Sequence, residues 1–203
     1  TVLKGALAHL VYEGIEKAVG AFKDFAEEAM VFNDSIAKVS TIADATVPIT
    51  ELQDSIVELS NQTGISSSEI AENVYNAISA GQETADSVNF VENATKLARA
   101  GFAETGNALD ILSTIMNAYG MEASEVTRVS DVLIQTQNLG KTTVAELSSA
   151  MGKVIPTANA YGVSLEQLAA GYAIMTANGV ATAESTTYMN SMLNELGKSG
   201  TGV

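Results

Sequence analysis

Residues 141–196 read KTTVAELSSAMGKVIPTANAYGVSLEQLAAGYAIMTANGVATAESTTYMNSMLNEL, and this stretch decides the fold. It holds two similar junctions between helical patterns, Tyr161-Gly162-Val163-Ser164 and Asn178-Gly179-Val180-Ala181-Thr182. A glycine after a helical run can take the left-handed backbone conformation that ends a helix. A Ser or Thr two or three positions later can cap the next helix. The two junctions therefore predict three consecutive helices of antiparallel type.

The same junction chemistry recurs along the chain. Its joint glycines, each followed by an apolar residue, are Gly64, Gly120, Gly162 and Gly179. Predicted cap residues are Thr50, Ser66, Ser124, Thr143, Ser164 and Thr182, and three of them precede a Glu or Gln at capping-box spacing (Glu69, Glu146, Gln167). These signals predict helices over about 50–61, 66–80, 86–100, 107–119, 124–139, 143–155, 164–177 and 182–197.

Interruptions inside these patterns carry information as well. Pro156 removes an amide donor, so the helix that begins near Thr143 should bend or end before it. Gly152 and Gly171 lie inside helical patterns and indicate close helix packing, with a hinge as the alternative. No run of alternating β-branched residues is long enough for a strand, so the predicted fold class is all-α, with short helices joined by glycine turns.

Residues 3–43 contain no proline and no turn cluster, which favours one long N-terminal helix. Apolar or small residues recur there at steps of three and four, the rhythm of a coiled-coil seam, at Ile15, Ala18, Phe22, Phe25, Ala29, Phe32, Ile36 and Val39. One interpretation is a self-association seam formed by Ile15, Phe22, Phe25, Phe32, Ile36 and Val39. The other is a core-facing helix of a monomeric bundle. The predicted organisation is a long helix over 1–45, a helical core over 46–197 and a linker or the start of a next segment over 198–203.

Composition and charge exclude several classes of function. The net charge of −14, with only two arginines and no basic patch, argues against specific nucleic-acid binding. The chain has no cysteine and a single histidine, His9, and it contains no glycine-rich phosphate-binding motif. We therefore expect no catalytic site, no metal and no cofactor. No window of about 20 residues is free of polar interruption, so no transmembrane span is expected.

From about Thr41 onward, over roughly three quarters of its length, the sequence resembles the core region of phage tail tape measure proteins. The ordered series that carries the resemblance comprises Thr63-Gly64-Ile65-Ser66 with Glu69, Ala77-Ile78-Ser79-Ala80-Gly81, Ala118-Tyr119-Gly120, Val129-Ser130-Asp131-Val132-Leu133 and most of Lys141–Leu196. Each short motif is weak by itself, and the order and spacing of the series give it specificity.

The resemblance implies a virion structural protein without an active site. Proteins of this family fill the lumen of the growing tail tube, set tail length and leave ahead of the DNA during infection. The implied partners are other copies of the chain, commonly three or six, tail tube proteins, tail tip or baseplate proteins and tail assembly chaperones. Contact with the host envelope on ejection is also implied, as are assembly in the host cytoplasm and residence in the tail tube lumen.

Two other classes of function stay open at the level of sequence. The first is a helical adaptor or interaction module that works outside any virion. The second is a segment of a lytic enzyme, because some long tape measure proteins carry hydrolase domains elsewhere in the chain. The gene neighbourhood would separate the first from a tail protein, and a peptidoglycan-release assay would detect the second.

Overall fold

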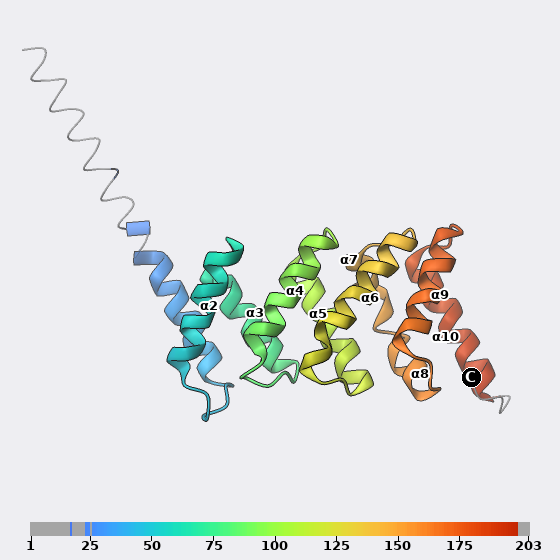
Figure 1. Cartoon of the computed structure of the whole chain (residues 1–203), viewed down its shortest axis with the longest axis horizontal. Coiled ribbons are helices and arrows are strands. Elements are labelled where there is room, and N and C mark those ends of the chain that lie inside the picture. The colour runs from blue at the N-terminus through green and yellow to red at the C-terminus, as the bar shows by residue number, and fades with distance from the viewer. Residues whose placement is uncertain (1–16, 18–22, 25, 199–203) are drawn as a thin grey trace, which may run out of the picture.

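The computed structural model describes residues 17, 23–24 and 26–198, and the regular elements among them are all helical (Figure 1). Residues 26–40 form the first helical segment described without a gap. The helices that follow are α2 (Ile49–Thr63), α3 (Ser67–Ser79), α4 (Ser87–Ala100), α5 (Thr105–Tyr119), the 3₁₀ turn η1 (Ala123–Glu125), α6 (Val126–Leu139), α7 (Val144–Met151), α8 (Ile155–Ala160), α9 (Leu165–Ala177) and α10 (Thr182–Lys198). The predicted all-α class is confirmed.

The helices form two rows that run along the molecule. In one row α2, α4, α6 and α9 contact each other in succession. In the other row α3 contacts α5, α5 contacts both α7 and α8, and these two contact α10. Because α2 pairs with α3, α4 with α5 and α9 with α10 across the rows, the molecule is a stack of antiparallel helix pairs (Figure 1).

One continuous hydrophobic cluster fills the space between the two rows. It begins with Ile36 and Val39 of the first helical segment and continues to Met189 and Leu193 of α10. Many of its members are alanines, which let neighbouring helices approach closely. The boundary predicted at residues 45 and 46 stays a prediction, although side chains from both sides of it join this cluster.

Five helix ends share one hydrogen-bond pattern. In each, a backbone N–H donates to the carbonyl five residues earlier, as in a Schellman motif, over 2.9–3.1 Å. The residue just before the donor has positive φ: Gly81 (97°), Phe102 (51°), Gly120 (61°), Gly162 (74°) and Gly179 (93°). Gly64, with φ of 70°, ends α2 in the same left-handed region. All four joint glycines named from the sequence therefore lie at helix ends in this conformation.

Three of the predicted helix caps are confirmed. The hydroxyl of Ser66 accepts the amide of Glu69, and complete capping boxes form at Thr143 with Glu146 and at Ser164 with Gln167. Pro156 lies in the first turn of α8, after a break that follows Met151. The stretch expected to hold three helices therefore holds four.

Two other predicted caps are wrong. Thr50 lies inside α2, because the helix already begins at Ile49 directly after Pro48, whose fixed φ suits a helix start. Ser124 lies inside the 3₁₀ turn η1, where the Glu122 amide donates to Oε2 of Glu125 over 3.3 Å. Thr182 begins α10, but its hydroxyl donates to Thr142 and Glu146 at the start of α7, so it ties two helices together.

A repeated tetrapeptide links successive pairs of the stack. Asn-Ala-Tyr-Gly occurs at 117–120 and again at 159–162. The Asn117 side-chain amide donates to the Ala80 carbonyl at the end of α3, and Asn159 donates to Ala118 near the end of α5, each over 2.7 Å. The tyrosines reach forward: Tyr119 donates to the Val163 carbonyl over 3.0 Å, and the Tyr161 ring lies against Gly197. Each copy thus contacts both the preceding and the following part of the stack.

Candidate interaction surfaces

The predicted self-association seam is only partly within the described residues. Ile15, Phe22 and Phe25 lie outside them. Val39 and Ile36 are buried, and Phe32 packs partly against the core of its own chain. Lys38 and Ser35 line a small pocket together with residues of α3, so this end of the first helical segment is covered by the chain itself. A contact with another copy would therefore have to use residues earlier in the segment, where Met30 and Val31 are exposed.

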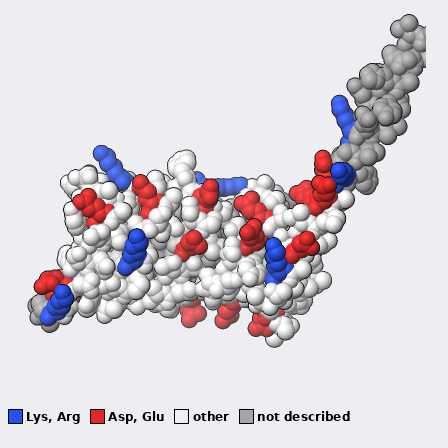
Figure 2. Space-filling model, turned by 180° about the vertical axis from the view of Figure 1, so that it is seen from behind, with Lys and Arg blue, Asp and Glu red and all other residues white. Residues whose placement is uncertain are grey.

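The described residues offer little of the chemistry that an active site needs. They contain no group of three or more His, Cys, Asp or Glu side chains arranged to hold a metal ion. His9, the single histidine, lies outside them. Figure 2 shows acidic side chains spread along the molecule, with the basic ones well separated from each other. None of the described helices combines the length and the apolar character needed to span a bilayer.

The clearest charged cluster joins two helices of one row. Arg128 of α6 makes ion pairs with Glu125 over 2.8 Å and with Glu166 of α9. The hydrogen bond from Arg128 holds the pKa of Glu125 below its usual value. All three side chains are substantially exposed. The cluster therefore helps α9 to lie against α6 and has no proton-transfer geometry.

A buried polar pair lies between the last two helices. Tyr172 of α9 is completely buried, and its hydroxyl forms a hydrogen bond with Oγ1 of Thr186 in α10. Burial raises the pKa of Tyr172 to about 12, so the phenol is neutral at ordinary pH. Thr186 also donates to the Thr182 carbonyl over 3.1 Å. The pair fixes how α9 and α10 face each other.

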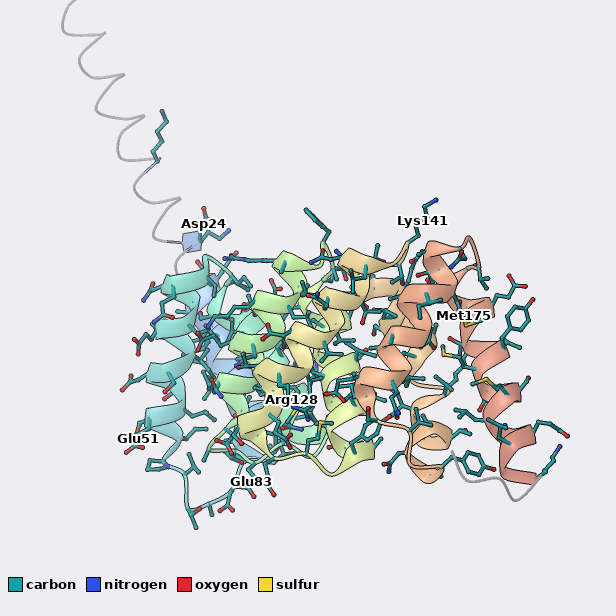
Figure 3. The ribbon with its side chains drawn as sticks, turned by 45° about the vertical axis from the view of Figure 1, so that its right-hand side comes forward. Asp24, Glu51, Glu83, Arg128, Lys141 and Met175 are labelled. Carbon is teal, nitrogen blue, oxygen red and sulfur yellow. The ribbon has the colours of Figure 1, made fainter. Side chains whose placement is uncertain are left out.

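An apolar groove opens on the outer side of this last pair. It has a volume of about 540 Å³ and is lined by Val163, Gln167, Leu168, Gly171, Ile174, Met175, Tyr188, Met189, Met192 and Leu193. None of these ten residues is charged. Figure 3 shows Met175 between the α9 and α10 ribbons, at the end of the molecule opposite Asp24. The helices that the structure describes leave this face uncovered.

The floor of the groove depends on a close approach of the two helices. A Cβ atom on Gly171 would lie 2.8 Å from Sδ of Met189, which is closer than atoms normally pack. Gly171 therefore serves close packing of α9 on α10, one of the two roles that the sequence left open. Gly152 follows the last residue of α7 and has only Thr114 near its Cβ direction, at 3.7 Å.

A second exposed apolar group stands at the joint between α4 and α5. The side chain of Phe102 is 90% exposed, and its backbone has the positive φ that glycine provides at the other joints. Sequence reasoning missed both this residue and the groove. The signal for Phe102 was the pair Gly101-Phe102 at a helix end, and the signal for the groove was the uniformly apolar run of α9.

Residues 53–202 match the family described as phage-related minor tail proteins. The chain is 41% identical over 200 residues to a "Probable tape measure protein" of Clostridium phage phiCD119, an alignment that covers 96% of this chain and 21% of that relative. It is 24% identical over 168 residues to a "Tape measure protein" of Pneumococcus phage Dp-1, covering 82% of this chain and 15% of that relative.

These two curated relatives are much longer than the present chain, which spans only 21% of one and 15% of the other. No solved structure matches.

Proposed function

This chain belongs to the phage-related minor tail protein family, as a segment of tape measure type, and on that premise we propose that it resides in the lumen of a phage tail tube. The observation that carries the proposal is the 41% identity to a probable tape measure protein across almost the whole chain. The uncharged end groove and the exposed Phe102 add apolar contact surfaces suited to assembly. The net charge of −14 suits a protein that precedes DNA through the tube without binding it.

Within a tape measure protein, we infer that this segment is a folded unit and that the ruler lies elsewhere. A single extended helix advances about 1.5 Å per residue. Here the chain doubles back at every pair, so its length along the stack per residue is far smaller (Figure 1). Tail length would then be set by other parts of the longer protein, and this segment would contact tail tip, baseplate or tube proteins and assembly chaperones.

Mass spectrometry of purified tails and electron microscopy of engineered particles test these proposals together. We expect peptides of this chain in the tails. We also expect in-frame deletions outside it to shorten tails by up to about 1.5 Å per residue removed. Deleting residues 46–197 should instead stop tail assembly. Tails without such peptides would favour an adaptor outside the virion. If deletion of residues 46–197 gave intact tails that were shorter in proportion to the residues removed, the folded-unit role would be contradicted.

Self-association is a separate part of the proposal. Since Ile36 and Val39 are buried in their own chain, a seam between copies would use the residues up to Phe32. Light scattering measures the number of copies in the assembly formed by the parent protein. The Phe25→Asp variant is compared with Val57→Asp, a control at an exposed position. We expect only Phe25→Asp to lower the copy number. An unchanged copy number would exclude the seam.

We also infer a structural and not an enzymatic role, because the family that the chain matches is one of phage tail proteins. A peptidoglycan-release assay on the chain measures this directly. Release above that of a heat-denatured sample would contradict the inference.

A further inference from the structure

The last helix of the first row has an unusual distribution of apolar residues. A helix on the surface of a soluble protein normally carries polar residues on its outer side. The inner side of α9 buries Leu165, Leu168 and Tyr172. Its outer side carries the uncharged residues Gln167, Gly171, Ile174 and Met175, and the Ile174 side chain is 65% exposed. From Leu168 to Met175, α9 is thus apolar on both its inner and its outer side. A helix surface of this kind is normally covered, which indicates that this part of α9 has a further neighbour.

The adjoining face of α10 has the same character. Tyr188 and Met192 are 50% and 54% exposed, and both line the groove with Ile174. The part of the chain that the structure describes has eight large apolar side chains that are exposed, and three of them meet in this one groove. Such a concentration on one face marks a contact surface.

The stacked arrangement of helix pairs indicates which kind of structural element would pack over the groove. Along the stack, each helix pair packs against the next: α4 and α5 contact α6 and α7, and α6 and α7 contact α9 and α10. The groove lies on the side of α9 and α10 that faces away from this series (Figure 3). In a stacked-repeat protein the terminal unit needs a polar outer face for solubility. The groove on this unit is instead uncharged and mostly apolar, so it has the position and the chemistry of an internal contact between pairs.

The size of the groove favours an occupant on the same polypeptide. A stable interface between separate chains takes roughly 20–30 residues from each side, whereas ten residues line the groove. A segment joined by a short linker needs far less contact area, because its effective concentration is high. The residues after α10 read Ser199-Gly200-Thr201-Gly202, with the glycines typical of the joints in this chain. The family match also runs past α10 to residue 202.

We propose that the groove between α9 and α10 binds the next helix pair of the same, longer polypeptide, which extends the stack beyond the part described. The occupant is an amphipathic helix pair with an uncharged apolar face, packed over Ile174, Tyr188 and Met192. The inference rests on the proposal that this chain is one segment of a longer tape measure protein. It gives that protein a folded region larger than the present stack.

Photo-cross-linking in the purified full-length parent protein tests the proposal without requiring tails. p-Benzoylphenylalanine replaces Met192 in the groove, and in a matched control it replaces Asn194, which is exposed on α10 but does not line the groove. Ile174→p-benzoylphenylalanine repeats the test from α9. Both substituted groove positions are more than half exposed, so the fold tolerates the change. Mass spectrometry then maps the cross-linked peptides.

We expect the groove positions to cross-link within the same chain to the ~45 residues that follow Val203, the length of one repeat unit at most. The yield should be at least tenfold above that of the Asn194 control and independent of protein concentration. A cross-link to a second copy, to a distant segment or to nothing overturns the proposal, as does a reading frame that stops close to Val203. This experiment uses purified protein and no tails. A negative cross-linking result would therefore count against the groove proposal alone, whereas absence of the chain from tails would count against the proposed function.

Discussion

Phe102 adopts a backbone conformation that the fold elsewhere assigns to glycine. It is the one non-glycine residue with positive φ among those described. The Ala103 amide completes the same helix-end hydrogen bond to Ala98, over 2.9 Å, that follows Gly81 and Gly120. A non-glycine residue in the left-handed backbone region costs about 1–2 kcal/mol of stability. A ring that is 90% exposed gains little stabilising free energy from burial in exchange. The fold alone therefore does not explain Phe102.

Phe102→Gly should stabilise the chain. Removing the left-handed strain gains about 1–2 kcal/mol, and the added flexibility of glycine in the unfolded chain offsets about 0.5–1 kcal/mol of that. We expect a net gain of roughly 0.5–1 kcal/mol in the free energy of unfolding, measured by urea denaturation. Gly120→Ala, at the equivalent joint, should show the opposite sign. A loss of stability in Phe102→Gly would mean that the ring packs in solution.

The burial of Tyr172 leads to a prediction of how the free energy of unfolding changes at alkaline pH. Its pKa is about 12 in the folded state because the ring is buried, against 10 for a free tyrosine. Since the folded pKa is the higher one, its stabilising contribution is fully present below about pH 10 and is lost as the pH rises through about 12. Two pKa units correspond to roughly 3 kcal/mol.

Urea denaturation at about pH 8 and about pH 11.5 measures this contribution. Tyr172→Phe should cost about 1 kcal/mol at the lower pH, from the lost hydrogen bond to Thr186. It should remove much of the alkaline loss of stability between the two values. Tyr75→Phe is the control, because the Tyr75 side chain on α3 is only partly buried. Equal alkaline losses in Tyr172→Phe and the unsubstituted chain would show that the phenol is not buried.

At the scale of the helices, the sequence predicted what depends on near neighbours. The capping boxes at Thr143 and Ser164 each involve a partner three residues away, so their spacing was visible in the sequence. Thr50 and Ser124 have the correct residue type but the wrong position, because Pro48 and Glu122 set the helix starts instead. Local hydrogen-bond chemistry was thus predictable where no competing start signal lay within two residues.

The helix caps give a prediction that separates two confirmed caps, Thr143 and Ser164, from Ser124, one of the two wrong ones. Thr143→Ala and Ser164→Ala each remove a hydroxyl that accepts a first-turn amide, and each should lower the free energy of unfolding by about 1 kcal/mol. Ser124→Ala should change it by less than about 0.5 kcal/mol, because that hydroxyl is exposed and caps no helix. Thermal denaturation of the three variants side by side checks the order. A Ser124→Ala loss as large as the other two would restore it as a cap.

At the scale of the whole molecule, the arrangement of the rows was not predictable from apolar periodicity. Faces built from leucine, valine, isoleucine and alanine can pack against many partners, so they do not identify which helix lies beside which. The repeated Asn-Ala-Tyr-Gly at 117–120 and 159–162 was the available signal, because its Asn and Tyr contact successive pairs. The groove was likewise not predicted, since exposure of Ile174 depends on where the stack ends.

A stack of pairs predicts uneven protection from hydrogen exchange. In such a structure the stability is approximately a sum over units and their interfaces, and opening is local. The pair α4–α5 contacts neighbours on both sides, whereas the main contacts of α10 among the described helices are with α7, α8 and α9. We expect amides in α4 and α5 to exchange slowest and those in α10 among the fastest of the helices, as measured by mass spectrometry of the 203-residue chain.

The same measurement on the longer parent protein links this gradient to the end groove. A helix pair packed over Ile174 and Met192 converts α9–α10 from a terminal unit into an internal one, so its amides should exchange at least tenfold more slowly. Amides of α4 and α5, already covered on both sides, should change little and provide the internal control. Uniform exchange along the isolated chain would mean that the stack opens as one cooperative unit, in which case stability would not be distributed pair by pair.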